Sequence, residues 1–311
     1  MKRKILVMGT PFFAAQVLEH LLTLDEVEII GVVCQPDRKM SRRKKFVYSE
    51  VKEVALRKDL PLFQPEKIKD LLPTIQDLKP DKIITCAYGQ FLPQSILDFG
   101  VINIHASLLP KYRGGAPMQH AIMNNESKTG ISLMKSVLKM DAGPVYKSKE
   151  VDIEINDTLT TLELKLIQAS KQLLSQSILD VIDDKIEPVK QDESKVTFSL
   201  TIKREDEFID FNRDQLEVYN HLRALIEEPC GYSFINGKRI KFTKVSLGDK
   251  VTDLPHSTIR FEHPEYFEIS TNNGMIKVLE CQLEGKQRQK ASDIYNGYHQ
   301  AFNLRRLNYE N

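Results

Sequence analysis

The sequence predicts an α/β protein with a doubly wound, mostly parallel Rossmann-like sheet in its N-terminal part and a small, OB-like β-barrel in its C-terminal part. Two patterns lead to this prediction. Up to about residue 124, short apolar runs alternate with segments whose apolar residues recur at helical spacing, which is typical of strand-helix-strand units. After about residue 230, short strand-like runs follow one another between turn signals, which is typical of a barrel or curled sheet.

Each element of the N-terminal part is predicted from its hydrophobic period. Short apolar runs predict strands over 5–8, 27–33, 60–63, 83–87 and 101–105. Helical spacing or composition predicts helices over 13–22, 49–58, 65–72 and 116–124. Two further strands are expected over 129–137 and 144–153, and then a long helix from Thr158 until the pattern fades at 183–184.

The chain changes character after this helix. The polar, unperiodic sequence EPVKQDES over 187–194 is typical of a linker, and a helix is expected over 213–225 with no long helix elsewhere beyond the linker. Turns such as Asn236-Gly237 separate the strands expected over 232–235, 239–245, 258–261, 267–271 and 275–282. We therefore predict an α/β domain over 1–188, a linker over 189–204 and a β-barrel domain over 205–311.

Composition and motifs exclude several classes of protein. The formal net charge is +1, so a nucleic-acid partner would need a local basic footprint. The four cysteines lie far apart, with no cluster at metal-ligand spacing, so we expect a reducing, cytoplasmic location and no metal. No segment approaches the roughly 18 consecutive apolar residues of a membrane span, so no membrane partner is expected. Gly9-Thr10-Pro11 lacks the G-x-G-x-x-G and G-K-[ST] motifs, and Ser107 lies outside any G-x-S-x-G elbow.

The candidate chemistry centres on three polar residues. In the predicted strand 101–105, Asn103 and His105 share one face because side chains alternate along a strand. Asp141 lies in the connection between the next two strands. An amide and an imidazole can stabilise the oxyanion that forms when an amine attacks an acyl carbon, and an Asp paired with the His can assist proton transfer. The alternative is structural: Asn103 begins a turn, His105 is a buried structural histidine and Asp141 forms a turn beside a glycine.

The most uneven charge run lies after the second predicted strand. Six basic residues and no acidic one occur between Arg38 and Lys45. A solvated loop explains most such runs. Here the run follows a strand end, where ligands of open α/β sheets bind, so contact with phosphate groups is an equally serious alternative.

Several blocks of the sequence resemble the tRNA-formylating branch of the family of 10-formyltetrahydrofolate-dependent formyltransferases. INIHASLLPKYRGGAP is highly specific for the wider family. The order of the N-terminal blocks, the basic loop and the trailing domain select the tRNA branch. The resemblance covers essentially the whole chain, through the blocks MGTPFFA, CQPDR, FQPEKI, AYGQFLP, INIHASLLPKYRGGAPMQHAI, TGISLMKSVLKMDAGPVY and NGMIKVLECQLEGKQRQKASDIYNG.

The resemblance implies an enzyme that transfers a formyl group from the cosubstrate 10-formyltetrahydrofolate to the amino group of methionyl initiator tRNA, for translation initiation. The domain over 1–188 would be catalytic, and we expect a monomer. Asn103 and His105 would stabilise the oxyanion, and Asp141 would orient His105 and assist proton transfer. The implied folate-binding residues are Tyr88, Gly89, Gln90, Phe91, Leu92, Ser107, Leu108, Leu109, Pro110 and Val137. The implied tRNA-binding residues are Arg38, Arg42, Arg43 and Lys44.

Two departures from the family pattern concern the C-terminal domain. The chain has Asp210-Phe211 and Glu228-Pro229-Cys230-Gly231 where the family commonly has tryptophan, and it contains no tryptophan at all. Residues 204–311 carry 15 basic against 17 acidic residues, a formal charge of −2. Auxiliary tRNA binding would then need a local cluster such as Lys238, Arg239, Lys241 and Lys244, and a purely structural role for this domain is about equally plausible.

Two alternative functions stay open from the sequence. The same transfer could act on a small amine such as glycinamide ribonucleotide or an amino sugar, although such a substrate needs neither the basic loop nor the barrel. A noncatalytic RNA-binding relative is the second alternative, and the three intact candidate catalytic residues argue against it.

Overall fold

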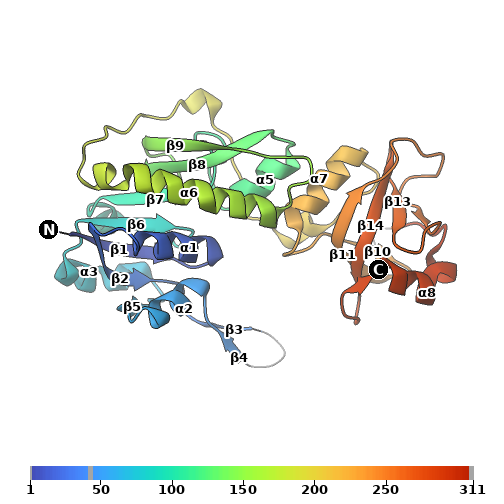
Figure 1. Ribbon diagram of the computed structural model, residues 1–311, viewed down its shortest axis with the longest axis horizontal. Helices are drawn as coiled ribbons and strands as arrows, with labels where there is room; N and C mark the ends of the chain where they lie inside the picture. The colour runs from blue at the N-terminus through green and yellow to red at the C-terminus, as the bar shows by residue number, and fades with distance from the viewer. Residues whose placement is uncertain (1, 41–44, 308–311) are drawn as a thin grey trace. The chain divides into compact units, whose positions relative to one another are not determined.

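The computed structural model describes residues 2–40 and 45–307, and the chain divides into two compact units (Figure 1). The first unit comprises Met1–Pro117, Lys128–Asp152 and Glu163–Leu200. The second unit comprises Met118–Ser127, Ile153–Leu162 and Thr201–Asn311. No helix in the described ranges combines the length and apolar character needed to cross a bilayer.

The first unit is built on a seven-stranded sheet in the order β5-β2-β1-β6-β7-β8-β9. The first five strands in this order are parallel, and β8 and β9 are antiparallel additions at one edge. The strands are β1 (Arg3–Gly9), β2 (Val27–Val33), β5 (Leu62–Phe63), β6 (Lys82–Cys86), β7 (Val101–His105), β8 (Lys128–Lys135) and β9 (Val145–Asp152). The prediction of a mostly parallel Rossmann-like sheet is confirmed.

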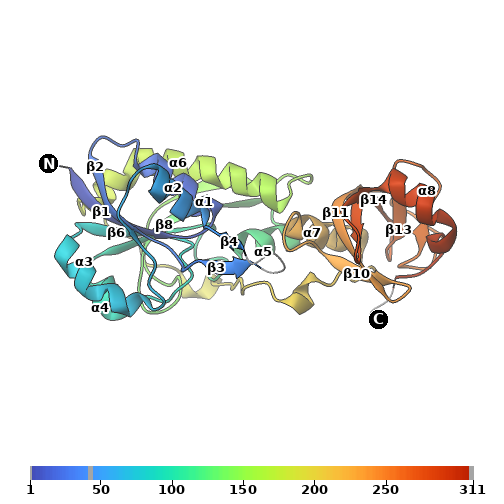
Figure 2. The ribbon, with the colours of Figure 1, turned by 90° about the horizontal axis from the view of Figure 1, so that it is seen from below.

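Helices cover both faces of this sheet. Figure 2 shows α1, α2 and α6 on one face and α3 and α4 on the other. On the α3/α4 side, a buried core joins strand residues such as Leu6, Ile83 and Val101 to Ile75 and Ile96 of the helices. The helical elements are α1 (Phe12–Leu21), α2 (Glu50–Arg57), η2 (Ile68–Leu71), α3 (Leu72–Leu78), α4 (Gln94–Leu97) and α6 (Leu159–Ile182), with a short hairpin of β3 (Arg38–Met40) and β4 (Lys45–Val47) between β2 and α2.

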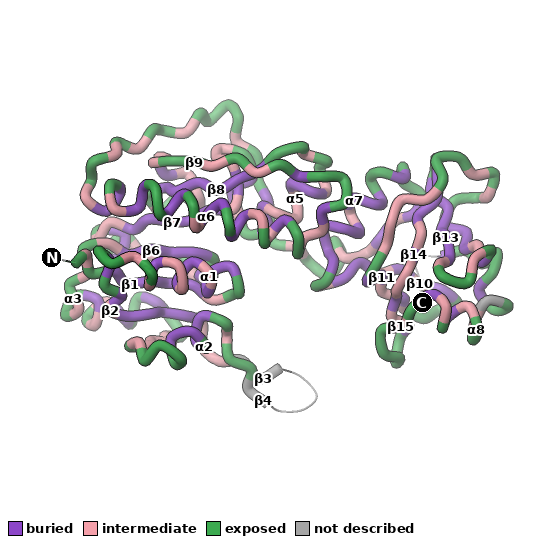
Figure 3. The backbone as a smooth tube through the Cα atoms, in the orientation of Figure 1, coloured by how far each residue is buried: buried purple, intermediate pink, exposed green. Residues whose placement is uncertain are grey.

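Strand alternation decides where the polar residues of β7 lie. Val101 belongs to the core on the α3/α4 side, so Asn103 and His105 occupy the same face at successive pleats. Ile102 and Ile104 lie on the other face and are buried. Figure 3 shows that β7 and β8 are largely buried, whereas β9 at the sheet edge alternates between partly buried and exposed residues.

The second unit is a curled antiparallel sheet with its own core. Its strand order is β10-β11-β14-β13-β12, with β15 paired to β14, and Phe211, Phe242, Phe267 and Ile294 lie in its buried core. The predicted C-terminal β-barrel or curled sheet is therefore confirmed as a curled antiparallel sheet. Its strands are β10 (Tyr232–Ile235), β11 (Lys238–Leu247), β12 (Ile259–Arg260), β13 (Phe267–Ser270), β14 (Met275–Leu283) and β15 (Gln289–Lys290). The remaining elements of the chain are α5 (Pro117–Met123), η3 (Glu193–Lys195), η4 (Arg204–Glu207), α7 (Gln215–Leu225) and α8 (Ala291–Phe302).

The secondary structure differs from expectation in several places, including the short helix α4, which the sequence did not predict. The expectation of no long helix beyond 213–225 is wrong, because α8 buries Ala291, Ile294 and Phe302 in the core of the second unit. The helix expected over 65–72 is instead the 3-10 turn η2, which continues into α3. The basic stretch begins and ends with the paired strands β3 and β4, where only a loop was expected.

Candidate active site

The site begins with Asn103, whose side chain is held by the neighbouring strand. Thr85 of β6 lies beside Asn103 in the parallel register, and its Oγ1 donates to Asn103 Oδ1 over 2.9 Å. The amide nitrogen therefore points the other way, and Nδ2 lies 3.4 Å from Oδ1 of Asp141. A hydroxyl that fixes the oxygen end of an amide leaves the donor end directed at the site, as oxyanion stabilisation requires.

His105 is buried, and both of its ring nitrogens face oxygen atoms. Nε2 lies 2.8 Å from the backbone oxygen of Tyr112, and Nδ1 lies 3.7 Å from Oδ2 of Asp141. Because a carbonyl oxygen only accepts, Nε2 carries the hydrogen of its bond. The other nitrogen, Nδ1, is then the atom that can take up or release a proton beside the Asp141 carboxylate.

Asp141 is fixed by a backbone donor from a second loop. The N–H of Gly114 donates to Asp141 Oδ2 over 2.9 Å. Gly114 has a φ of +128°, and a Cβ added there would lie 2.3 Å from the backbone oxygen of Ser199, so no other residue fits without a shift of the chain. Asp141 has a φ of +48°, which places its carboxylate by a left-handed turn in the connection between β8 and β9. Asn103 and His105 of β7 thus meet Asp141 of the β8–β9 connection at one point, as the sequence hypothesis requires.

The segment 88–92, predicted to contact folate, occupies several environments. Tyr88 and Leu92 pack in or against the core on the α3/α4 side, and burial raises the pKa of Tyr88 to about 12. Gln90 is tied to η2, since its Oε1 accepts from the N–H of Ile68 over 2.8 Å. Gly89 and Phe91 are exposed, and the ring of Phe91 is 78% exposed.

The segment 107–110, also predicted to contact folate, is held in place by hydrogen bonds to neighbouring residues. Ser107 is fully buried, and its hydroxyl donates to the backbone oxygen of Lys111 over 2.6 Å. Ser132 Oγ donates to the backbone oxygen of Ser107 over 2.7 Å and accepts from the N–H of Leu109 over 3.2 Å. Leu108 and Pro110 are partly buried. The Ser107 hydroxyl is thus used to hold the loop.

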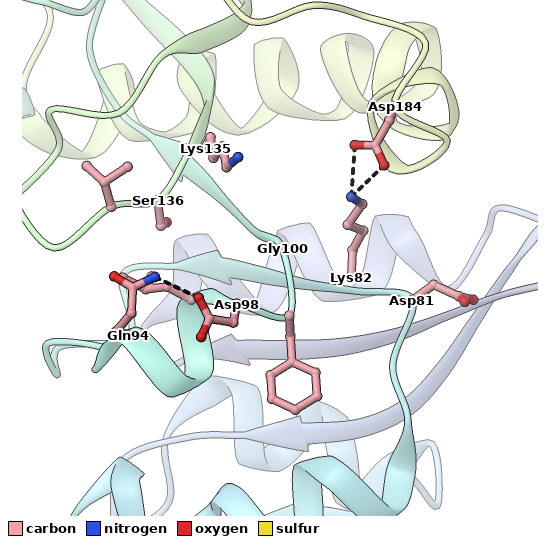
Figure 4. A pocket seen from close by; sticks show the side chains of 11 residues that line it. Asp81, Lys82, Gln94, Asp98, Gly100, Lys135, Ser136 and Asp184 are labelled. Atoms are coloured by element: carbon pink, nitrogen blue, oxygen red, sulfur yellow. Dashed lines mark hydrogen bonds and ion pairs between the residues drawn. The ribbon is translucent and has the colours of Figure 1, made fainter.

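A cavity of about 610 Å³ lies beside the starts of β6 and β7, and Figure 4 shows its lining. Gln94 and Leu97 of α4 contribute to it, as do Lys135, Ser136 and Val137 after β8. Of the residues predicted to contact folate, Val137 lines this cavity and the other nine do not. Its wall is mainly polar, and Figure 4 shows the ion pair of Lys82 with Asp184 at 2.8 Å.

The basic stretch predicted to bind tRNA follows β2, and its described part is the strand pair of β3 and β4. Arg38 begins β3, whereas Arg42, Arg43 and Lys44 lie outside the described residues. The base of the hairpin is anchored at Asp37, which forms an ion pair with Lys52 of α2. Hydrogen bonds from Gln64, over 2.9 Å, and from Lys52 hold the pKa of the Asp37 carboxyl below its usual range.

Three residues that support the site were not foreseen from the sequence. Thr85 orients Asn103, the N–H of Gly114 binds Asp141, and Gln191 donates to the backbone oxygens of Asp141 and Gly143 over 2.8 and 2.6 Å. Gln191 gave no signal, because it lies 50 residues from Asp141 in a polar stretch.

Comparison with known proteins decides the family. The family model described as formyl transferase matches residues 1–178, and the model of the formyl transferase C-terminal domain matches residues 201–299. The chain belongs to the formyl transferase family. Curated methionyl-tRNA formyltransferases include relatives from Malacoplasma penetrans, 44% identical with 95% of this chain and 93% of theirs covered, and from Bacillus subtilis, 41% identical with 95% of each covered. The fold is similar to that of HypX from Aquifex aeolicus, crystallised with tetrahydrofolic acid, at a TM-score of 0.67 and 15% identity over 97% of this chain and 48% of that one.

Proposed function

We propose that the protein transfers a formyl group from 10-formyltetrahydrofolate to the free amino group of methionyl initiator tRNA, for translation initiation. The observation that carries the proposal is the likeness to methionyl-tRNA formyltransferases over nearly the full length of both chains, 44% identical to the Malacoplasma penetrans enzyme. The convergence of Asn103, His105 and Asp141 supports the same chemistry. We further propose that the protein acts as a monomer in the cytoplasm.

In this mechanism, the donor end of Asn103 and the ring of His105 stabilise the negative charge that develops on the formyl oxygen. The amine loses a proton as it attacks the formyl carbon, and the departing folate nitrogen gains one. His105 Nδ1, 3.7 Å from Asp141, is the atom placed to move these protons. Asp141 holds the ring in position and is itself fixed by the N–H of Gly114. No protein nucleophile is needed, because the amine attacks the formyl group directly.

The segments 88–92 and 107–110 and the residue Val137 are proposed to bind the folate cosubstrate. Exposed apolar side chains support this role. Phe91 in the segment 88–92 is 78% exposed, and Val137 and Leu138 after β8 are 39% and 63% exposed. Exposed apolar groups of this kind suit the flat ring of a folate. HypX, a structural relative, was crystallised with tetrahydrofolic acid.

The basic hairpin is proposed to bind the tRNA, and replacing Arg42 and Arg43 together with alanine tests this role. We expect a higher KM for methionyl-tRNA and an unchanged KM for 10-formyltetrahydrofolate. The slope of log affinity against log salt is negative, and each lost phosphate contact is also expected to reduce its magnitude by about 1. The measurement is steady-state kinetics at several salt concentrations.

A matched control removes two exposed cations elsewhere in the first unit. Lys67 and Lys69 lie at η2, and both are exposed. Lys67→Ala with Lys69→Ala is expected to leave the KM for tRNA and its salt dependence unchanged. Equal salt slopes for wild type and the Arg42/Arg43 variant would exclude the hairpin as the tRNA contact.

Lys238 and Lys244, exposed on β11, are proposed as auxiliary tRNA contacts from the C-terminal domain.

The choice of amine substrate is tested by parallel assays of the wild-type protein. With 10-formyltetrahydrofolate as donor, kcat/KM for methionyl-tRNA is compared with that for glycinamide ribonucleotide and for an amino sugar. The proposal predicts transfer to methionyl-tRNA and little or none to the small amines. A higher kcat/KM for either small amine would replace the proposed function with the small-amine alternative.

A further inference from the structure

The segment 189–200, part of the expected linker, is bound to the loops that carry the candidate catalytic residues. At one end, the backbones of Val189 and Val145 exchange two hydrogen bonds of 2.8 Å. At the other end, the N–H of Arg113 donates to Thr197 O over 2.9 Å, and the N–H of Ser199 donates to Arg113 O over 2.8 Å. The segment is therefore hydrogen-bonded to the rest of the first unit on both sides of Gln191.

Gln191 holds the turn that carries Asp141. Its Nε2 donates both hydrogens, one to the backbone oxygen of Asp141 over 2.8 Å and one to that of Gly143 over 2.6 Å. Asp141 has a positive φ, a conformation that is less favourable for a residue with a side chain and is stabilised by a constraint from its surroundings. Two hydrogen bonds from one amide to the oxygens on either side of Ala142 supply such a constraint.

Arg113 fixes the orientation of this amide. The Arg113 side chain is fully buried, and its Nε and one terminal nitrogen donate to Gln191 Oε1 over 3.0 and 2.9 Å. Because arginine only donates, the oxygen of Gln191 must face Arg113 and the NH2 group must face the Asp141 turn. The Arg113 charge is balanced by Glu193 at 2.7 Å, and the ion pairs with Arg113 and Lys139 hold the pKa of Glu193 below its usual range.

The two sides of Asp141 are thus held by adjacent parts of one assembly. Arg113 holds Gln191, which binds the main-chain oxygen of Asp141. Gly114, the residue after Arg113, donates its N–H to the Asp141 carboxylate. Ser199 in the same segment donates from Oγ to Tyr112 O over 3.0 Å, the oxygen that also bonds to His105 Nε2. The segment therefore touches the supports of both Asp141 and His105.

We infer that Gln191, oriented by Arg113, is a positioning residue for Asp141 during formyl transfer, and that the segment 189–200 is part of the active site. The inference rests on the catalytic role proposed for Asp141. A displacement of about 1 Å in a reacting group can lower a rate by about 100-fold, so a residue that touches no substrate can still control the rate.

The variant Gln191→Glu separates positioning from folding. The introduced carboxylate has nearly the same shape and still accepts from Arg113, so the segment stays attached. It has no NH2 group, so both bonds to the Asp141 turn are lost and oxygen faces oxygen. We expect kcat to fall roughly 10- to 100-fold in a variant that is still fully folded at the assay temperature, with an unchanged KM for methionyl-tRNA. Hydrogen exchange is expected to increase within residues 137–145.

Two further variants complete the test. Gln76→Glu makes the same change at an exposed residue of α3 and is expected to keep the wild-type kcat. Gln191→Asn keeps the amide but is shorter by one methylene, so it cannot reach both Arg113 and the turn, and its kcat is expected to lie between those of wild type and Gln191→Glu. If Gln191→Glu does not fold, Gln191→Asn decides the question by the same measurements.

The outcomes distinguish this inference from the proposed function. If the wild type is active and Gln191→Glu keeps the wild-type kcat, the positioning role is overturned and the proposed function still stands. If Gln191→Glu does not fold, a wild-type kcat for Gln191→Asn has the same meaning. A loss of kcat that only parallels a loss of folded protein would overturn it as well. A wild type that transfers no formyl group to methionyl-tRNA would refute the proposed function, and the inference with it.

Discussion

Replacing His105 with alanine is expected to lower kcat for formyl transfer by about 100- to 10,000-fold while leaving the binding of methionyl-tRNA intact. The loss has two physical causes. The ring nitrogen beside Asp141 no longer moves protons, and one of the two groups proposed to stabilise the oxyanion is removed. Single-turnover transfer at saturating substrate measures the chemical step, and filter binding of the tRNA measures affinity separately.

His256→Ala is a suitable control for the His105 variant, because His256 is exposed in the second unit. It is expected to retain the wild-type rate. An unchanged rate of transfer in His105→Ala would remove His105 from the catalytic residues, and a folded variant with no tRNA affinity would indicate a binding role in its place.

Asp141→Asn is expected to lower kcat by roughly 100-fold or more with little change in shape. The carboxylate accepts from the N–H of Gly114 over 2.9 Å and faces Nδ1 of His105 at 3.7 Å. An amide at this position carries no charge to assist proton transfer, and it must turn either its oxygen or its NH2 group toward His105. The rate is measured by single-turnover transfer, and circular dichroism checks the fold.

The matched control for Asp141→Asn is Asp77→Asn on α3, where the carboxylate is exposed. This control is expected to transfer formyl groups at the wild-type rate. If Asp141→Asn were as active as Asp77→Asn, Asp141 would have only the structural role in a turn that is the alternative interpretation of the sequence.

Local patterns predicted the parts of the site that depend on strand periodicity. The alternation in Val101–His105 predicted that Asn103 and His105 share a face, and the structure places both on the α3/α4 side. The alternating strands and helices predicted the parallel sheet for the same reason. These features depend on neighbours within a few residues, and the sequence displays them directly.

Features created by distant contacts were not predictable in this way. Gln191 reaches Asp141 across 50 residues, and Arg113 reaches Glu193 across 80, while the segment between 187 and 194 shows only the polarity of a linker. The fully buried Arg113 also belongs to a sequence, KYRGG, that suggests an exposed loop. In contrast, α8 could have been predicted, since Ile294, Tyr298 and Phe302 recur at four-residue spacing.

The central claim is tested most directly by following the formyl carbon. Wild-type protein is incubated with methionyl initiator tRNA and 10-formyltetrahydrofolate labelled with ¹³C in its formyl group, and the tRNA-linked amino acid is analysed by mass spectrometry. We expect the label on the amino group of methionine, with tetrahydrofolate released in equal amount. Label found only in free formate, or methionine that stays unformylated, would contradict it.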